Sequence, residues 1–241
     1  MCLIYMEVVS NILNKFGFTR SSENSTGVKV ILGVPGCGKT SCIREILKAD
    51  CRFIAYTFGV ADCKNVTGQY IKKAPTGTYE RPQNSIVIID EFQAGDWKRF
   101  EPNYIFGDIC QFDSDFVDIP RSHWYKTESH RVCREVCDLL NRLGFEITSK
   151  VSGELTVEGL YIGEPEGSII SYCSKVQALL KSHNLDFLGI EECRGKTVEV
   201  ATLCLEDHQI HPEDRGKFFL CATRASRKLK IFTPDAAEPT T

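Results

Sequence analysis

The feature that most constrains this chain is the stretch Gly-Val-Pro-Gly-Cys-Gly-Lys-Thr at residues 33–40. It matches the pattern G-x-x-x-x-G-K-[ST] at every fixed position. An apolar run at residues 28–32 precedes it, and a helical pattern at residues 41–49 follows it. This context predicts a phosphate-binding loop, because the glycines let several backbone N–H groups point at one anion beside the positive end of a helix dipole.

Two side chains of this loop carry specific chemistry. We expect Lys39 to reach the β- and γ-phosphates of ATP, and Thr40 to bind Mg²⁺ through its hydroxyl. The residues predicted to bind the nucleotide are Gly33, Pro35, Gly36, Cys37, Gly38, Lys39, Thr40 and Ser41. The alternative is a glycine-rich turn that only caps a helix, and the complete match in this context argues against it.

Length and charge limit the class of protein. The 241 residues suffice for one large domain or two compact ones. A formal net charge of -3 excludes a globally basic nucleic-acid-binding protein but leaves room for a local basic groove. No apolar run approaches the length of a transmembrane helix and no signal-peptide pattern opens the chain, so we expect no membrane insertion.

The chain contains 12 cysteines, which are spread along its length. None forms a C-x-x-C pair, and Cys133 and Cys137 have no histidine at metal-ligand spacing. We therefore expect core thiols in a reducing cytosol, and a zinc site is the alternative.

Apolar runs and helical patterns alternate along the chain. Strands are predicted at residues 28–32, 52–58, 86–89, 104–106, 168–172, 197–205 and 228–232, and helices at residues 7–16, 41–49, 132–143, 174–183 and 212–225. Residues 64–82 are polar with interspersed Gly and Pro, which predicts an irregular surface segment. The alternation predicts an α/β fold with parallel sheets.

The same pattern predicts the domain organisation. We expect an N-terminal helix and linker at residues 1–26, a first domain with the phosphate-binding loop at residues 27–125, and a second domain at residues 126–232. The acidic, irregular stretch at residues 112–122 marks the boundary. The polar tail at residues 233–241 is expected to be disordered.

Asp90 and Glu91 follow the apolar run at residues 86–89. Ligands of parallel α/β sheets bind outside the carboxyl ends of the strands, so this pair is the expected partner of the loop. Asp90 would hold Mg²⁺ through water, Glu91 would polarise the attacking water, and Gln93 would sense the γ-phosphate. The alternative is an acidic turn at a strand end, and the upstream loop favours the functional interpretation.

Three further side chains are candidates for the same site. Gln111 follows the strand at residues 104–106 and would report γ-phosphate occupancy. Without the other motifs, a turn with a helix cap would be the preferred interpretation of this stretch. Arg131 and Arg224 lie in the second domain and would stabilise the charge of a phosphoryl-transfer transition state. Such arginines would couple the nucleotide state to domain closure, whereas the alternative for each is an ordinary surface arginine.

The ordered set of stretches resembles the motifs of superfamily 1 helicases. Motif I corresponds to residues 33–40, motif II to 90–93, motif III to 107–111, motif IV to 129–131, motif V to 192–197 and motif VI to 222–224. The chain more closely resembles the first triple gene block proteins of flexuous plant RNA viruses such as carlaviruses and potexviruses. That resemblance rests on the loop, on Glu91-Phe92-Gln93 after Asp90, and on the segment at residues 6–18, which ends in Phe16-Gly17-Phe18.

This resemblance implies two RecA-like P-loop NTPase domains with the nucleotide in the interdomain cleft. It implies a Mg²⁺-dependent, RNA-stimulated ATPase and helicase-like activity, cell-to-cell movement of viral RNA and suppression of host RNA silencing. The implied partners are single-stranded RNA, other viral movement proteins, the coat protein, host silencing factors and a second copy of the chain. The implied location is the host cytoplasm and the plasmodesmata.

Two other functions fit the same residues. The chain would act mainly as an interaction protein that suppresses silencing or self-associates, with the nucleotide setting only its shape. It would alternatively be a P-loop NTPase unrelated to RNA.

Arg194 stands where motif V of the family commonly has Gln. The 241 residues also leave little room for the inserted subdomains of processive helicases, so hydrolysis is a firmer expectation than unwinding.

Overall fold

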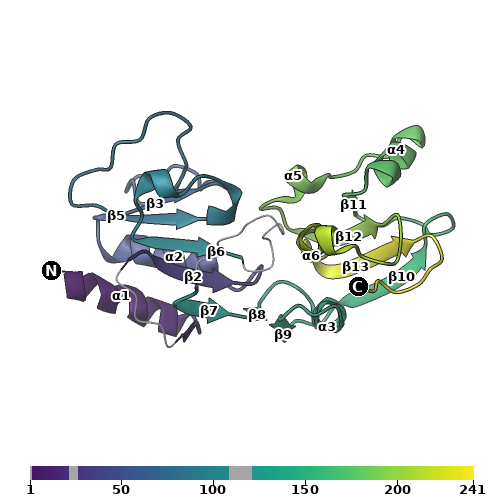
Figure 1. Cartoon of the computed structure of the whole chain (residues 1–241), viewed down its shortest axis with the longest axis horizontal. Coiled ribbons are helices and arrows are strands. Elements are labelled where there is room, and N and C mark those ends of the chain that lie inside the picture. The colour runs from purple at the N-terminus through teal and green to yellow at the C-terminus, as the bar shows by residue number, and fades with distance from the viewer. Residues whose placement is uncertain (1, 22–26, 109–120) are drawn as a thin grey trace. The chain divides into compact units, whose positions relative to one another are not determined.

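The computed structural model of the chain describes residues 2–21, 27–108 and 121–241 (Figure 1). These residues form two compact units. Unit 1 ends at Lys126 and unit 2 begins at Thr127. Each unit is built on its own sheet of mainly parallel strands, which confirms the predicted α/β class.

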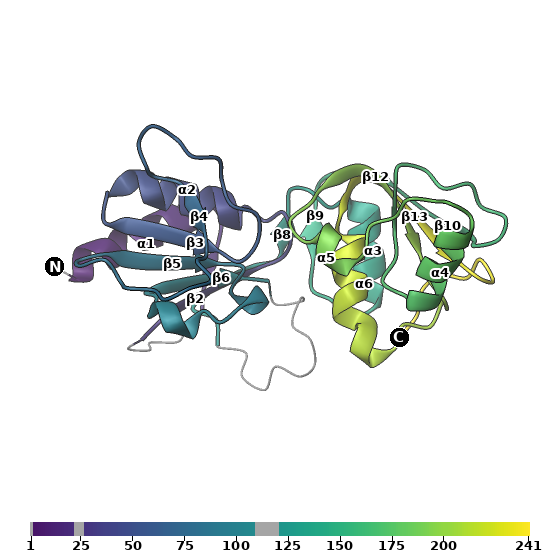
Figure 2. The ribbon, with the colours of Figure 1, turned by 90° about the horizontal axis from the view of Figure 1, so that it is seen from above.

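Unit 1 contains a seven-stranded sheet in the order β1-β7-β2-β6-β5-β3-β4, and Figure 2 shows β4, β3, β5, β6 and β2 following one another. The strands are β1 (Thr19–Arg20), β2 (Lys29–Gly33), β3 (Phe53–Thr57), β4 (Ile71–Lys73), β5 (Ile86–Asp90), β6 (Tyr104–Gly107) and β7 (Trp124–Lys126). All neighbours are parallel except β1 and β7, so the carboxyl ends of β2 to β7 share one edge.

The helices of unit 1 are α1 (Cys2–Lys15) and α2 (Lys39–Ala49), with two 3₁₀ turns, η1 (Phe92–Ala94) and η2 (Lys98–Phe100). The predicted helix at residues 7–16 is thus longer at its start. It ends where predicted, because Gly17 adopts a positive φ of 76°. The Phe18 N–H donates to the Leu13 carbonyl at 3.0 Å, and the Gly17 N–H donates to the Asn14 carbonyl at 2.9 Å, which is a Schellman motif.

The central strands of unit 1 are buried on both faces. Val87, Ile88 and Ile89 of β5 are each 0% exposed. A parallel strand between two others must present apolar side chains to both layers, so it reads as a continuous apolar run and not as an alternating one. The prediction of a buried central strand at residues 86–89 is confirmed.

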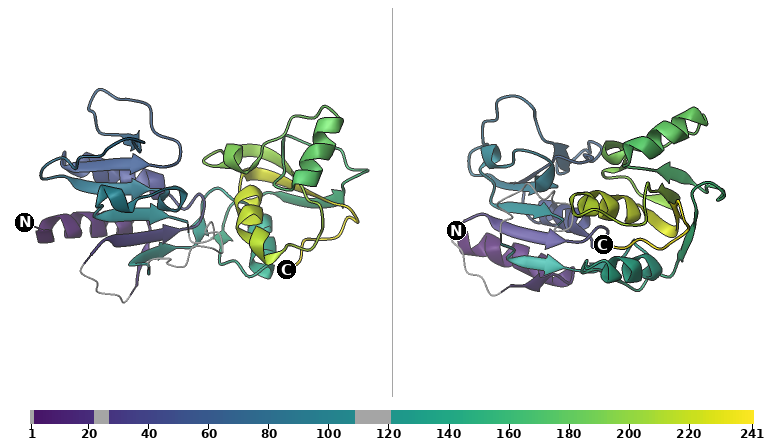
Figure 3. Two further views of the ribbon diagram at one scale, coloured as in Figure 1. Left: turned by 45° about the horizontal axis from the view of Figure 1, so that its top comes forward. Right: turned by 45° about the vertical axis from the view of Figure 1, so that its right-hand side comes forward.

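Unit 2 contains a four-stranded parallel sheet in the order β10-β13-β12-β11. The strands are β10 (Glu154–Gly159), β11 (Ser168–Ile170), β12 (Val198–Cys204) and β13 (Ala225–Thr233), and β8 (Glu128–Ser129) pairs separately with β9 (Thr148–Ser149). The helices are α3 (Arg134–Arg142), α4 (Ser174–Ser182), α5 (Ile190–Cys193) and α6 (Arg215–Ala222), preceded by the 3₁₀ turn η4 (Pro212–Asp214). In Figure 3 the teal α3, the green α4 and the yellow-green α6 surround this sheet.

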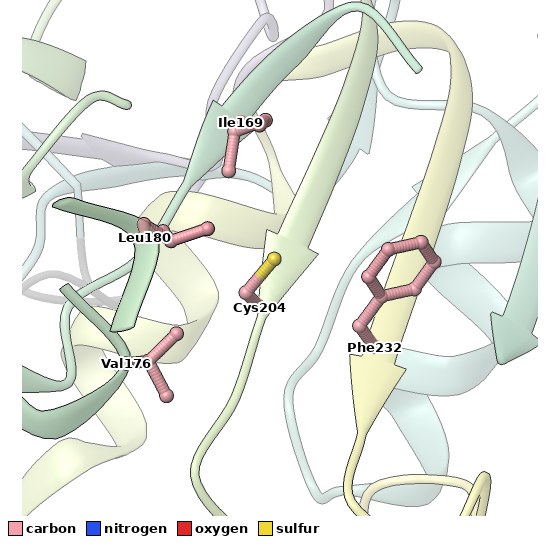
Figure 4. Packing of buried hydrophobic residues seen from close by; sticks show 5 residues of the cluster. All are labelled: Ile169, Val176, Leu180, Cys204 and Phe232. Atoms are coloured by element: carbon pink, nitrogen blue, oxygen red, sulfur yellow. The ribbon is translucent and has the colours of Figure 1, made fainter. Parts of the chain in front are cut away.

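One face of the unit 2 sheet is closed by α4. Val176 and Leu180 of that helix pack with Ile169, Cys204 and Phe232, which project from three strands (Figure 4). Successive residues of a strand point to opposite faces, so Leu229 and Ile231 of β13 face the other side, where both are 0% exposed. The sheet is therefore packed on both faces.

Several predictions need correction. Residues 64–82 contain β4, which adds a parallel strand next to β3 and buries Ile71. The three-residue strand is too short to show a period in the sequence. The predicted helix at residues 212–225 is a 3₁₀ turn followed by the shorter α6, and Ala225 already begins β13. The tail at residues 233–241 is paired, because the Thr240 N–H donates to the His208 carbonyl at 2.8 Å.

The cysteines follow the expectation in part. In the described part of the chain, the buried thiols are Cys37, Cys42, Cys133, Cys137, Cys193, Cys204 and Cys221, whereas Cys51 and Cys63 are exposed. Among residues 2–21, 27–108 and 121–241, no cluster of three or more His, Cys, Asp or Glu side chains is arranged to hold a metal ion. No helix within those residues combines the length and apolar character needed to cross a membrane.

Ile88→Ala tests the packing of unit 1. Ile88 is fully buried between β3 and β6, so its truncation should lower the free energy of unfolding by about 2–5 kcal/mol. Both tryptophans, Trp97 and Trp124, lie in unit 1, so tryptophan fluorescence in urea reports on this unit. Val66→Ala, at a fully exposed position, is the control and should leave the midpoint unchanged.

Candidate functional site

The phosphate-binding loop connects β2 to α2 at the carboxyl edge of the unit 1 sheet. Gly36 and Gly38 have φ values of 74° and 100°, a region that side chains with a Cβ rarely adopt. Gly38 is the N-cap residue of α2. The loop thus turns sharply into the first turn of the helix, where backbone N–H groups lack intrahelical partners and favour an anion.

Lys39 is buried within this loop, with 7% of its surface exposed. Its Nζ donates to the carbonyl oxygens of Gly33 at 2.6 Å and of Val34 at 3.1 Å. The ammonium group therefore lies over the loop itself, at the position from which it would meet a phosphate bound by the loop amides.

The charge on Lys39 is supported by acidic groups around it. Burial acts to lower the pKa of Lys39, but electrostatic interactions with Cys37, Asp108, Glu91 and Asp90 act against it, and the net pKa is raised. The lysine consequently stays protonated inside the protein. A buried cation is tolerated because carboxylates from the ends of neighbouring strands compensate it.

Thr40 and Asp90 meet across the sheet edge. The Thr40 Oγ1 donates to Asp90 Oδ2 at 3.4 Å, although β2 and β5 are separated by β6. Asp90 is 3% exposed, and its Oδ1 accepts from the Glu91 N–H at 3.1 Å. Burial, followed by the charge of Glu91, raises the pKa of Asp90 to about 7 despite the opposing charge of Lys39.

These residues fit a magnesium ion. Mg²⁺ prefers oxygen ligands and binds through one or two carboxylates together with substrate phosphates. A hydroxyl and a buried carboxylate within hydrogen-bond reach beside the loop supply that chemistry. A carboxylate whose ionised form is disfavoured by burial and by a neighbouring carboxylate would also be relieved by a divalent cation.

Glu91 and Gln93 form a second pair at the same edge. Glu91 adopts a positive φ of 54° between β5 and η1. The Gln93 Nε2 donates to Glu91 Oε2 at 2.6 Å. Gln93 Oε1 is buried and accepts no hydrogen bond from the described residues. The amide therefore fixes the Glu91 carboxylate and leaves one acceptor in the interior of the site.

The remaining predicted residues lie elsewhere. Arg131 Nη1 donates to Thr197 Oγ1 at 2.9 Å within unit 2. Arg224 is buried in the same unit, where its Nε donates to the Leu220 carbonyl at 2.8 Å and its Nη1 to the Lys196 carbonyl at 3.2 Å. Gln111 lies outside the described residues. The structure thus brings Lys39, Thr40, Asp90, Glu91 and Gln93 together in unit 1 and describes the two arginines within unit 2 alone.

Sequence reasoning missed two residues near the loop. Asp108 is 1% exposed and acts electrostatically on Lys39, whereas the motif at residues 107–111 points to Gln111 as its functional residue. Lys126 ends β7, a strand that the sequence pattern did not predict, and its carbonyl accepts from the Val34 N–H at 3.1 Å. Asp108 lies within the motif that begins at Gly107, so the sequence could have indicated it. The contacts of Lys126 become visible only when β7 is seen to pair with β2.

Comparison with known proteins identifies relatives over the whole chain. Residues 29–233 match the viral superfamily 1 RNA helicase core domain. The movement and silencing protein TGBp1 of Poplar mosaic virus is 38% identical over 237 residues, covering 96% of this chain and 98% of the relative. The TGBp1 of Lily symptomless virus is 35% identical over 231 residues, with the same coverage of each chain.

Solved helicase structures share the fold. The arterivirus nonstructural protein 10 helicase is 18% identical, with a TM-score of 0.52, and the match covers 95% of this chain and 57% of that one. The PRRSV helicase is 16% identical, with a TM-score of 0.58 and coverage of 95% and 55%. The chain therefore spans little more than half the length of these helicases.

A lysine-containing phosphate loop on a parallel α/β sheet, with an Asp-Glu pair at the end of a nearby strand, defines a P-loop protein of the helicase type. The chain belongs to the viral superfamily 1 RNA helicase family and, within it, to the TGBp1 movement and silencing proteins. Family and fold together support NTPase and helicase-type activity in general. The resemblance inferred from the sequence motifs is confirmed.

Asp90→Asn tests the electrostatics of the site in metal-free buffer. The folded-state pKa of Asp90 is raised to about 7, so the folded protein binds more protons than the unfolded chain between about pH 4 and 7 and loses stability as the pH rises through that window. The Asp90→Asn variant has no carboxyl group at this position to ionise, so it does not lose this stability as the pH rises. It should exceed the wild type in unfolding free energy by up to about 4 kcal/mol at pH 8, and by less at pH 5.5.

The unfolding free energies of the wild type and of Asp90→Asn are measured at each pH by tryptophan fluorescence in urea, with EDTA present. An Asp90→Asn advantage that is equal at pH 5.5 and pH 8 would contradict the raised pKa.

Proposed function

We propose that this protein is a Mg²⁺-dependent ATPase that acts on single-stranded viral RNA, supports cell-to-cell movement of a plant virus and suppresses host RNA silencing. The observation that carries the proposal is the meeting of Lys39, Thr40, Asp90 and Glu91 at one sheet edge. The name of the relatives, movement and silencing protein, supports the two biological roles.

The chemistry follows from the residues of unit 1. The loop amides and Lys39 would bind the phosphates and hold the γ-phosphoryl group in place for attack. Glu91, held by Gln93, would orient a water molecule and accept its proton as the new P–O bond forms and the bond to the leaving ADP breaks. Thr40 and Asp90 would hold Mg²⁺, which neutralises charge on the phosphates.

The second unit supplies further elements of the proposal. Two RecA-like domains are the arrangement that the family implies. Arg131 and Arg224 would add positive charge for the transition state, and Gln111 would sense the γ-phosphate. In the present structure Arg224 donates to backbone carbonyls of its own unit, so a catalytic role would require it to exchange those bonds for phosphate oxygens.

The proposed partners are those that the family suggests. A helicase domain suggests nucleic-acid binding, and we propose single-stranded RNA as that nucleic acid. Other viral movement proteins, the coat protein, host silencing factors and a second copy of the chain are proposed partners, and the host cytoplasm and plasmodesmata are the proposed location.

Lys39→Ala tests the assignment of the loop. Loss of the ammonium group should lower the rate of ATP hydrolysis by on the order of a hundredfold or more, because a charge that contacts the transferred phosphate is removed. Lys48→Ala, an exposed position on the same helix, is the control and should hydrolyse ATP at the wild-type rate. A folded Lys39→Ala protein that retained the wild-type rate would refute the assignment.

The response to RNA and the Glu91→Gln variant test whether ATP hydrolysis is coupled to RNA binding and depends on Glu91. ATP hydrolysis by the wild type should rise when single-stranded RNA is added, and Glu91→Gln should abolish hydrolysis because it removes the group that accepts the proton. Hydrolysis indifferent to RNA, together with silencing suppression that survives Glu91→Gln, would instead favour a nucleotide-switched interaction protein. Stimulation by DNA alone would favour an NTPase unrelated to RNA.

A further inference from the structure

Lys126 connects the N-terminal helix to the phosphate-binding loop. It is the last residue of β7 and pairs with Gly33, the last residue of β2. Although charged, it is only 8% exposed. Its Nζ donates to the Phe16 carbonyl at 2.8 Å, while its own carbonyl accepts from the Val34 N–H at 3.1 Å. One residue thus contacts both the end of α1 and the first part of the loop.

The end of α1 is a favourable place for this cation. Phe16 follows the last helical residue, and Gly17 closes the helix in a Schellman motif. Carbonyl groups at a helix C-terminus carry partial negative charge, which a lysine ammonium stabilises. The Nζ also lies 5.9 Å from the centre of the Phe18 ring. Charge-assisted hydrogen bonds are stronger than neutral ones, and the low dielectric of a buried place strengthens them further.

The side chain of Phe16 also lies beside the loop. A Cβ placed on Gly38 would lie 3.5 Å from Cδ1 of Phe16, so the Phe16 ring is next to the N-cap residue of α2. The helix end is therefore close to the loop at two points. The Phe16 ring lies beside Gly38, and the Phe16 carbonyl accepts from Lys126, whose own carbonyl accepts from the Val34 N–H.

We propose that Lys126 and Phe16 are positioning residues of the nucleotide site, which hold the phosphate-binding loop in shape by fastening it to the end of α1. The inference deepens the proposed ATPase function and rests on it. Phosphate-binding amides are effective only when they are already oriented. Loosening the loop should weaken ground state and transition state binding alike, which raises the nucleotide Kd and KM and leaves kcat nearly unchanged.

This pattern separates positioning from a merely structural role. A buried hydrogen bond that only stabilised unit 1 would lower the urea midpoint and leave the nucleotide affinity of the folded protein as it was. The distinguishing measurement is therefore binding, made under conditions where each variant is folded. The probe is mant-ADP with Mg²⁺, followed by fluorescence titration of the full chain.

Lys126→Met is the central variant. Because it removes one charge-assisted hydrogen bond, it should raise the Kd for mant-ADP about tenfold, and kcat should stay within about threefold of the wild type. Lys126→Arg keeps the charge and should restore most of the affinity. Lys230→Met is the matched control: Lys230 is a buried lysine of unit 2 that also donates to a carbonyl, and its removal should leave the Kd unchanged.

Phe16→Ala supplies an independent variant. It removes the ring beside Gly38 but keeps the backbone carbonyl that Lys126 contacts, and it should also raise the Kd. The double variant should weaken binding by less than the product of the two single effects, because both act through the same helix end. This variant also carries the test if Lys126→Met does not fold.

The outcomes separate the two proposals. A wild type that does not bind mant-ADP would refute the proposed function itself. A wild type that binds, with folded Lys126→Met or Phe16→Ala proteins of equal affinity, would overturn the positioning role alone. Effects of Lys126→Met and Phe16→Ala that multiply fully would likewise overturn the shared link.

Discussion

The rest of unit 1 depends on the interaction between the buried Lys39 ammonium and the carboxylates around it. A lone buried cation would be costly, so carboxylates must be close to it. They come from Asp90, the last residue of β5, from Glu91, which follows it, and from Asp108 after β6. The loop therefore functions only if β2, β6 and β5 are neighbours with their carboxyl ends at the same edge, as the order of the sheet provides. The chemistry of the loop and the topology of the sheet are two aspects of one requirement.

The balance of charge at this edge also explains its suitability for a metal ion. Three carboxylates surround one ammonium, and Asp90 is ionised only with difficulty, as its pKa of about 7 reflects. A divalent cation at the Thr40–Asp90 pair would convert this surplus into a favourable interaction. The hydrogen bond from Gln93 to Glu91 does not change this balance of charge. It fixes the direction of the Glu91 carboxylate, whose backbone is already held at a positive φ.

The sequence predicted those parts of the fold whose residues carry their own signal. β5 can be predicted because a strand buried on both faces must be a continuous apolar run. The loop can be predicted because its glycines adopt backbone conformations that other residues rarely adopt. β7 and β10 carry no such signal. β10 contains Glu154 and Glu158, which interrupt any apolar run and pair with Lys228 and Lys230 of the adjacent β13. The same distinction applies to the site: Lys39 and Asp90 could be identified by residue type and spacing, whereas Lys126 acquires its contacts only when β7 lies beside β2.

Gly38 lies where the consensus loop approaches a residue outside the consensus. Its φ of 100° disfavours any residue with a Cβ. A Cβ at this position would lie 3.5 Å from Cδ1 of Phe16, which is ordinary van der Waals contact, and Phe16 directly follows α1. The α1 end, Lys126 and the loop consequently form one packed structure, and the boundary of the nucleotide site lies beyond the residues that its motif defines.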